Sequence, residues 1–168
     1  HNTHLVYNYP RLLLSRLWSS LNQKIYPRLP SKSKGNEFTM SVPVAGDVID
    51  WNEAMEQCGD DEEFLRELLS DLRGETNEQV AKIEETIRTP TDQPFHRIMR
   101  ASHVIKGAAS NLMCGQLRQT AMQLEQAAST MSNASTADPN AMAQIQSCYM
   151  ELRRAVENYN AFLRQIGV

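Results

Sequence analysis

The chain has 168 residues, 41% of them hydrophobic and 22% charged, and its formal net charge at pH 7 is −3. This composition fits one compact domain with some polar sequence to spare, and it excludes a collagen-like, disulfide-scaffold or wholly disordered chain. The longest apolar runs, such as Leu12–Leu14, fall far short of the roughly 20 residues that a membrane-spanning helix needs.

The first 39 residues differ from the rest of the chain in charge. Residues 1–39 carry six basic side chains and one acid, Glu37, whereas residues 40–168 carry eleven basic and nineteen acidic side chains. So acidic a body should repel phosphate backbones, and nucleic acid is therefore not expected as a partner. We interpret residues 1–39 as a basic, acid-poor extension or linker and residues 40–168 as the domain.

The basic extension has three interpretations. Leu13, Leu17 and Leu21 recur at helical spacing in a serine-rich stretch, which is typical of an organelle transit peptide. The segment is more simply foreign to the protein, because Met40 opens the acidic body directly; a helix that binds a membrane surface or a partner is the third interpretation. We expect a cytoplasmic location, with the nucleus open for a eukaryotic protein and an organelle only if the transit peptide is genuine.

The domain is predicted to begin with two helices. Residues 50–53 have the form of a capping box, and Gly59 ends the short helix that they open. Asp60 or Asp61 can cap a second, longer helix, which ends at Thr89 before a proline. Apolar residues at steps of three and four form its expected inward stripe: Phe64, Leu65, Leu68, Leu72, Val80, Ile83 and Ile87.

Three further helices are predicted. Pro94 fits the first turn of a helix that extends to about Met113, and Gly115 marks a break before a helix over residues 116–131. After a polar loop, Pro139 starts a last helix that includes Met142 and Ile166 among its inward residues. Four long amphipathic helices with short connections predict an all-α fold, an antiparallel four-helix bundle with a short preceding helix.

The helix that begins at Pro94 carries the residues that point to chemistry. Its expected inward stripe is Ile98, Ala101, Ile105, Ala108 and Leu112. At 100° per residue, the opposite face carries His96, Met99 or Arg100, His103, Lys106, Gly107 and Ser110. His103 is therefore expected to face solvent, with Lys106 and Gly107 as its neighbours at i+3 and i+4.

Gly107 is unusual because a mid-helix glycine costs about 1 kcal/mol relative to alanine. Its missing side chain clears the space over one edge of the His103 ring, so that another protein's backbone or reactive group can approach. Lys106 supplies positive charge beside any anion that His103 carries. These residues suit a histidine that accepts a phosphoryl group, with neutral imidazole as the nucleophile and lysine offsetting charge.

The segment His103-Val-Ile-Lys106-Gly107 resembles the His-x-x-Lys-Gly signature of the histidine-containing phosphotransfer (HPt) domains, which lies in a helix of a four-helix bundle. Its placement on the exposed face of the corresponding helix makes the resemblance specific, and the resemblance covers about residues 47–166. Other positions are similar to the family pattern: Ser102 before the histidine, Leu112, Leu124-Glu125, and the opening segments 49–51 and 59–65.

The resemblance implies a phosphorelay intermediate rather than an enzyme in its own right. His103 would accept a phosphoryl group from an aspartate on the receiver domain of a hybrid histidine kinase and pass it to the receiver of a response regulator. The receiver would bring the Mg²⁺ ion, so the chain is expected to have no cofactor of its own, no membrane or nucleic-acid partner, and a monomeric state. The rim that a receiver contacts is expected to include His96, Met99, Arg100 and Ser110.

Two departures from the family pattern keep a second interpretation open. Ala108-Ala109 stands where serines are frequent, and residues 113–115 replace the usual ending of the helix. A pseudo-HPt adaptor, which binds signalling partners without being phosphorylated, would tolerate such changes, although it would be expected to lose His103. A histidine kinase core lacks support because the chain has no glycine-rich nucleotide loop. A purely structural bundle would make Lys106 and Gly107 coincidences.

Neither disulfides nor a metal site are expected. Cys58, Cys114 and Cys148 are odd in number and widely spaced, which favours small apolar fillers in a reducing intracellular setting. His96 lies seven residues before His103, about 10.5 Å along a helix, which is too far for the two rings to share an ion.

Overall fold

The computed structural model describes residues 48–168 except residues 91 and 134–138. The basic extension, residues 1–39, lies outside the described residues, and its three interpretations stay open. All regular secondary structure in the described part is helical, which confirms the predicted all-α class. In chain order the elements are α3 (Trp51–Gln57), α4 (Glu62–Arg88), α5 (Pro94–Asn111), α6 (Gly115–Thr130), the 3₁₀ turn η1 (Met131–Asn133) and α7 (Pro139–Ile166).

Aspartate caps set the beginnings of α3 and α4. The Asp50 carboxylate accepts a hydrogen bond of 3.1 Å from the Glu53 N–H, and Asp61 accepts one of 3.0 Å from the Phe64 N–H. Of the two caps that the sequence allowed for α4, Asp61 is thus the one used. Asp60 instead adopts a left-handed φ of 61° in the turn between the helices.

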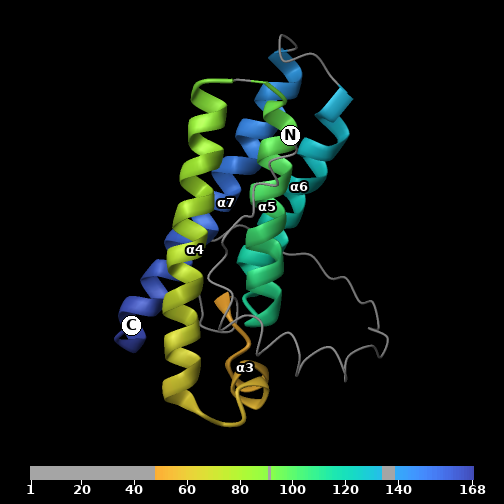
Figure 1. The fold of residues 1–168 in the computed structure, drawn as a ribbon. Helices are drawn as coiled ribbons and strands as arrows, with labels where there is room; N and C mark the ends of the chain where they lie inside the picture. The colour runs from red at the N-terminus through yellow and green to blue at the C-terminus, as the bar shows by residue number, and fades with distance from the viewer. Residues whose placement is uncertain (1–47, 91, 134–138) are drawn as a thin grey trace, which may run out of the picture. The chain divides into compact units, whose positions relative to one another are not determined.

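The four long helices form the predicted antiparallel bundle. Figure 1 shows α4, α5, α6 and α7 running alternately in opposite directions, with α3 at the end of the bundle where α5 ends and α6 begins. α5 packs against α4 and α6, and α7 packs against the same two helices. The Asp50 N–H donates to the Met113 carbonyl at 3.0 Å, and the Trp51 ring meets the Phe162 ring edge-on at a centroid distance of 6.2 Å. These contacts fix α3 to the bundle.

Apolar side chains from every long helix meet in the centre of the bundle, where removal from water stabilises the fold. The Tyr159 hydroxyl, also buried, donates to the Leu69 carbonyl at 2.8 Å and so links α7 to α4. The largest fully buried side chains are Tyr159, Ile49, Leu65, Leu69, Ile83, Ile98, Ile105, Leu117, Leu124, Ile145, Leu152 and Leu163.

The inward stripe of α5 differs in one position from the expected one. Ala108 is only half-buried, whereas Ala109 and Ser102 are fully buried. The cause is that α5 packs against two helices, so its buried arc extends further toward one side than a single stripe would. Four other residues expected to face inward are half-buried because they lie near helix ends: Phe64, Ile87, Met142 and Ile166.

Across the described ranges, none of the helices combines the length and apolar character needed to cross a bilayer.

Candidate functional site

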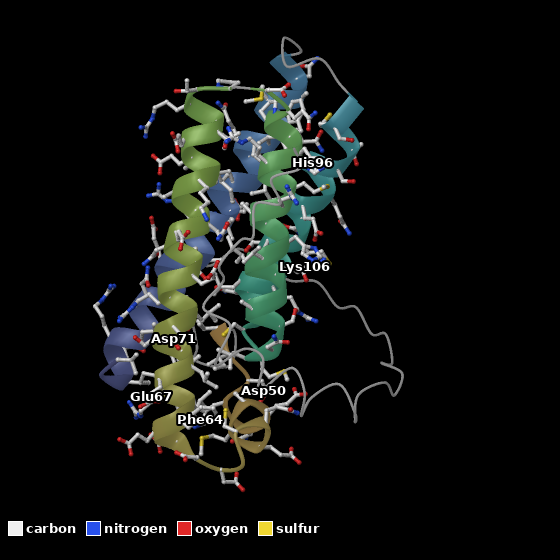
Figure 2. All side chains as sticks on the ribbon, viewed as in Figure 1. Asp50, Phe64, Glu67, Asp71, His96 and Lys106 are labelled. Carbon is white, nitrogen blue, oxygen red and sulfur yellow. The ribbon has the colours of Figure 1, made fainter. Side chains whose placement is uncertain are left out.

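His103 lies on the exposed face of α5, as the sequence predicted. Its side chain retains 67% of its accessible surface, and Lys106, one turn later, retains 30%. Figure 2 shows His96 and Lys106 along the same helix, with Lys106 nearer the end at which α3 lies. The fold therefore presents this histidine to solvent on a rigid helix rather than on a loop.

A carboxylate from the neighbouring helix holds both His103 and Lys106. Glu125 Oε1 lies 2.7 Å from His103 Nδ1, and Glu125 Oε2 lies 2.6 Å from Lys106 Nζ. Glu125 sits on α6 directly after the buried Leu124, and its side chain is only 18% exposed. The packing of α6 against α5 thus brings an acid to two residues of α5.

The pKa of Glu125 is lower than usual. Partial burial of the carboxylate acts to raise this pKa, but the hydrogen bonds from Lys106 and His103 and the positive charges of Lys106 and of a protonated His103 ring oppose that effect and outweigh it. Glu125 is therefore a carboxylate at neutral pH. It can accept hydrogen bonds from its two partners but can donate none.

The hydrogen bond to Glu125 selects one tautomer of the His103 ring. Because the carboxylate only accepts, Nδ1 of a neutral His103 must carry the proton in this contact. The Nε2 atom then keeps its lone pair, on a ring that is mostly exposed to solvent. This arrangement can act as a nitrogen nucleophile toward an electrophile brought by another molecule.

Packing within the described part of the chain gives no reason for the glycine at position 107. A Cβ added to Gly107 would meet no atom within 4 Å, and the residue is exposed in the middle of α5. Its backbone has helical geometry, so no left-handed φ requires glycine either. Gly74, in the middle of α4, is equally exposed and equally open, so the open space does not by itself distinguish Gly107.

The four residues expected to form the docking rim are all at least partly accessible. His96 and Arg100 are exposed, whereas Met99 and Ser110 are half-buried. The Ser110 hydroxyl donates to the Lys106 carbonyl at 2.7 Å and is therefore engaged within its own helix. None of the four touches Glu125 in the way that His103 and Lys106 do.

Sequence reasoning did not identify Glu125 as a site residue. In the sequence, Leu124-Glu125 indicates only a family resemblance, because helical spacing relates neighbours on one helix and gives no contact between residues 22 positions apart. One signal was present in the sequence. Glu125 is the sole carboxylate in residues 93–137, the stretch that contains α5 and α6.

The three cysteines are free thiols that are buried or half-buried among other side chains. Cys58 and Cys114 are buried and Cys148 is half-buried. Burial raises the pKa of Cys114 to about 12, so this thiol stays protonated at neutral pH. Among the described residues, no group of three or more histidine, cysteine, aspartate or glutamate side chains is placed to hold a metal ion.

The chain was compared with models of known protein families. The model of the Hpt domain matches residues 67–158, which is more than half of the chain. The matched range includes His103, Lys106, Gly107 and Glu125. Searches of curated proteins and of solved structures found no match.

Proposed function

The chain belongs to the Hpt domain family, whose members carry phosphoryl groups in phosphorelay signalling, and we propose that it does so through His103. In this proposal His103 accepts a phosphoryl group from the phosphorylated aspartate of one receiver domain and passes it to an aspartate of another. The chain is a carrier in this reaction. Its partners are the receiver domains of hybrid histidine kinases and response regulators.

The contact between His103 and Glu125 is the observation that carries the proposal. In the first transfer, the Nε2 lone pair forms a bond to phosphorus while the bond between phosphorus and the aspartyl oxygen breaks, and the leaving carboxylate keeps that electron pair. The Nδ1 proton stays on the ring, which becomes positively charged. Glu125, 2.7 Å from Nδ1, stabilises this charge as it develops. The return transfer reverses each step.

Lys106 and Gly107 have different roles in this proposal. The ammonium of Lys106 offsets negative charge on the transferred group, and its ion pair with Glu125 positions that carboxylate. At Gly107, one turn after His103, no side chain projects from the helix, so a receiver's backbone can approach the His103 ring. The open space around Gly107 is compatible with such an approach.

In this proposal the receiver domain supplies the remaining groups that the transfer needs. Phosphoryl transfer needs a cation at the phosphoryl oxygens, and we propose that the receiver supplies Mg²⁺ together with the aspartate. We further propose that His96, Met99, Arg100 and Ser110 contact the receiver. We expect a monomeric chain in the cytoplasm, with neither nucleic acid nor membrane as a partner.

Transfer from a phosphorylated receiver tests the proposal. The full chain and its His103→Gln variant are each incubated with ³²P-labelled receiver and Mg²⁺. We expect acid-labile, alkali-stable label on the wild type and none on His103→Gln. If the chain binds several receivers but takes label from none of them, it is an adaptor that binds signalling partners without phosphorylation.

A further inference from the structure

The charge on Lys106 is already matched in the unphosphorylated site. Lys106 Nζ lies 2.6 Å from Glu125 Oε2, and the same carboxylate accepts from His103. With a neutral ring, the positive Lys106 and the negative Glu125 cancel. A phosphoryl group adds two negative charges, and the ring that carries it becomes positive, so the cluster is left with one uncompensated negative charge.

Arg100 is placed to supply the missing positive charge. It lies three residues before His103, so the two side chains are neighbours on α5, with Cβ atoms roughly 5–6 Å apart. Arg100 is exposed, and its guanidinium has no ion pair or hydrogen bond with any described residue. No carboxylate occurs on α5 to compete for it.

The direction of the His103 ring favours Arg100 for direct hydrogen bonds to the phosphoryl oxygens, whereas Lys106 acts on the phosphoryl group through its charge alone. Lys106 lies about 60° to one side of His103 around the helix, and Arg100 lies about 60° to the other side. Because Lys106 reaches Glu125, the side of Lys106 is the side of α6. Anchoring Nδ1 to α6 turns the opposite ring edge, and Nε2 with it, away from Glu125. Helical side chains also lean toward the N-terminus, which brings the His103 ring over the turn that contains Arg100.

We propose that Arg100 is a phosphoryl-binding residue: its guanidinium donates hydrogen bonds to the oxygens of the phosphoryl group on His103 Nε2. This inference rests on the proposed function for its biological meaning, but the contact itself can be tested without a receiver. A planar guanidinium offers paired donors that match phosphoryl oxygens, which a lysine ammonium does not.

The contact is measured on chemically phosphorylated protein. Potassium phosphoramidate transfers its phosphoryl group to His103: the bond between phosphorus and nitrogen of the reagent breaks, ammonia leaves, and the bond from phosphorus to Nε2 forms. Spectra of ¹H–¹⁵N groups then report the arginine Nε–H signals before and after labelling. We expect one of these signals, absent in Arg100→Lys, to shift strongly on phosphorylation. An unchanged Arg100 signal on fully labelled protein would overturn the proposal.

The equilibrium of transfer gives a second, functional measurement. At equilibrium, the ratio of phosphorylated chain to phosphorylated receiver depends only on the free energies of the separate proteins. A residue that only contacts the receiver during docking changes the forward and reverse transfer rates by the same factor, so it leaves this ratio unchanged. We expect Arg100→Gln to lower this ratio about threefold to fivefold, as for an exposed ion pair. Arg100→Lys should restore it in part. The control Arg164→Gln removes the same charge from an exposed position near the end of α7 and should leave the ratio unchanged.

The two measurements separate the inference from the proposed function. If the Arg100 signal shifts but no receiver transfers its phosphoryl group, the contact is established and the relay role fails. If receivers transfer normally and Arg100→Gln changes only the rates, the relay role stands and Arg100 is a docking residue.

Discussion

His103 Nδ1 lies 2.7 Å from Glu125 Oε1, although 22 residues separate the two in the sequence. The histidine belongs to α5 and the glutamate to α6, so the tautomer of the His103 ring depends on how the two helices pack. This contact ties the chemistry of an exposed side chain to the buried interface beneath it.

Two substitutions of Glu125 should distinguish its effect on the tautomer of His103 from its effect on the rate of phosphoryl transfer. Glu125→Ala removes the acceptor, and we expect transfer to slow about tenfold, as for the loss of a charge-assisted hydrogen bond of about 1.5 kcal/mol. In Glu125→Gln the amide oxygen can still accept from Nδ1 but carries no negative charge, so its rate should lie between those of Glu125→Ala and the wild type. Imidazole ¹⁵N shifts measure the tautomer directly. If the neutral His103 ring of the wild type carries its proton mainly on Nε2, the mechanism is contradicted.

The lowered pKa of Glu125 predicts a pH dependence of stability. A carboxyl group whose pKa is lower in the folded state than in the unfolded state stabilises the fold above its unfolded pKa. That contribution is lost as the pH falls below about 4.5 and through the folded pKa. We expect the free energy of unfolding of Glu125→Gln to fall short of the wild-type value at pH 7, and the difference to narrow at pH 3. Urea unfolding at the two pH values checks this. A difference that stays constant between them would show that the ion pair contributes nothing.

The two mid-helix glycines provide a matched pair. Gly74→Leu and Gly107→Leu should each raise the free energy of unfolding by up to about 1 kcal/mol, because both residues are exposed in open space. Only Gly107→Leu should block transfer from a receiver. Gly74 lies on a different helix, α4, and faces outward there, roughly 200° around the helix from the buried Leu72, so a side chain at position 74 does not lie beside His103. Urea unfolding and transfer rates are measured on both variants. Wild-type transfer by Gly107→Leu would remove the steric role of the glycine.

Lys106→Ala should slow transfer while leaving the bundle folded. The variant loses a cation beside the phosphoryl group and also frees one oxygen of Glu125. Circular dichroism should show unchanged helix content, because alanine has the higher helix propensity. Lys106→Arg is the conservative partner and should retain part of the rate. If Lys106→Ala transfers as fast as the wild type, lysine has no part in the reaction.

The local features of this fold could be predicted from the sequence. Asp50 and Asp61 cap their helices and Pro94 occupies the first position of α5, whereas Gly115, the predicted break, is already the first residue of α6. Each of these depends on a residue and its near neighbours, which a sequence displays directly. The exposed face that carries His103 followed from the spacing of apolar residues along one helix.

Relationships between helices could not be predicted in the same way. The burial of Ala109 in place of Ala108 depends on where α4 and α6 both touch α5. The contact of Glu125 with His103 depends on the register of α6 along α5, which helical periodicity within one segment leaves undetermined. The sequence therefore predicted that His103 and Lys106 share one accessible helix face, while the carboxylate that contacts both emerged only with the packed bundle.

Because Glu125 lies on a second helix, a peptide that contains only the signature motif does not contain the whole site. A synthetic helix copied from residues 94–111 would carry His103, Lys106 and Gly107 but no carboxylate to fix the ring. A nascent chain whose α6 has not yet docked would likewise expose a histidine with its proton free to move between the two nitrogens. If His103 is the phosphoryl acceptor that we propose, its reactivity is acquired only on completion of the bundle, and incompletely folded molecules should be poor acceptors.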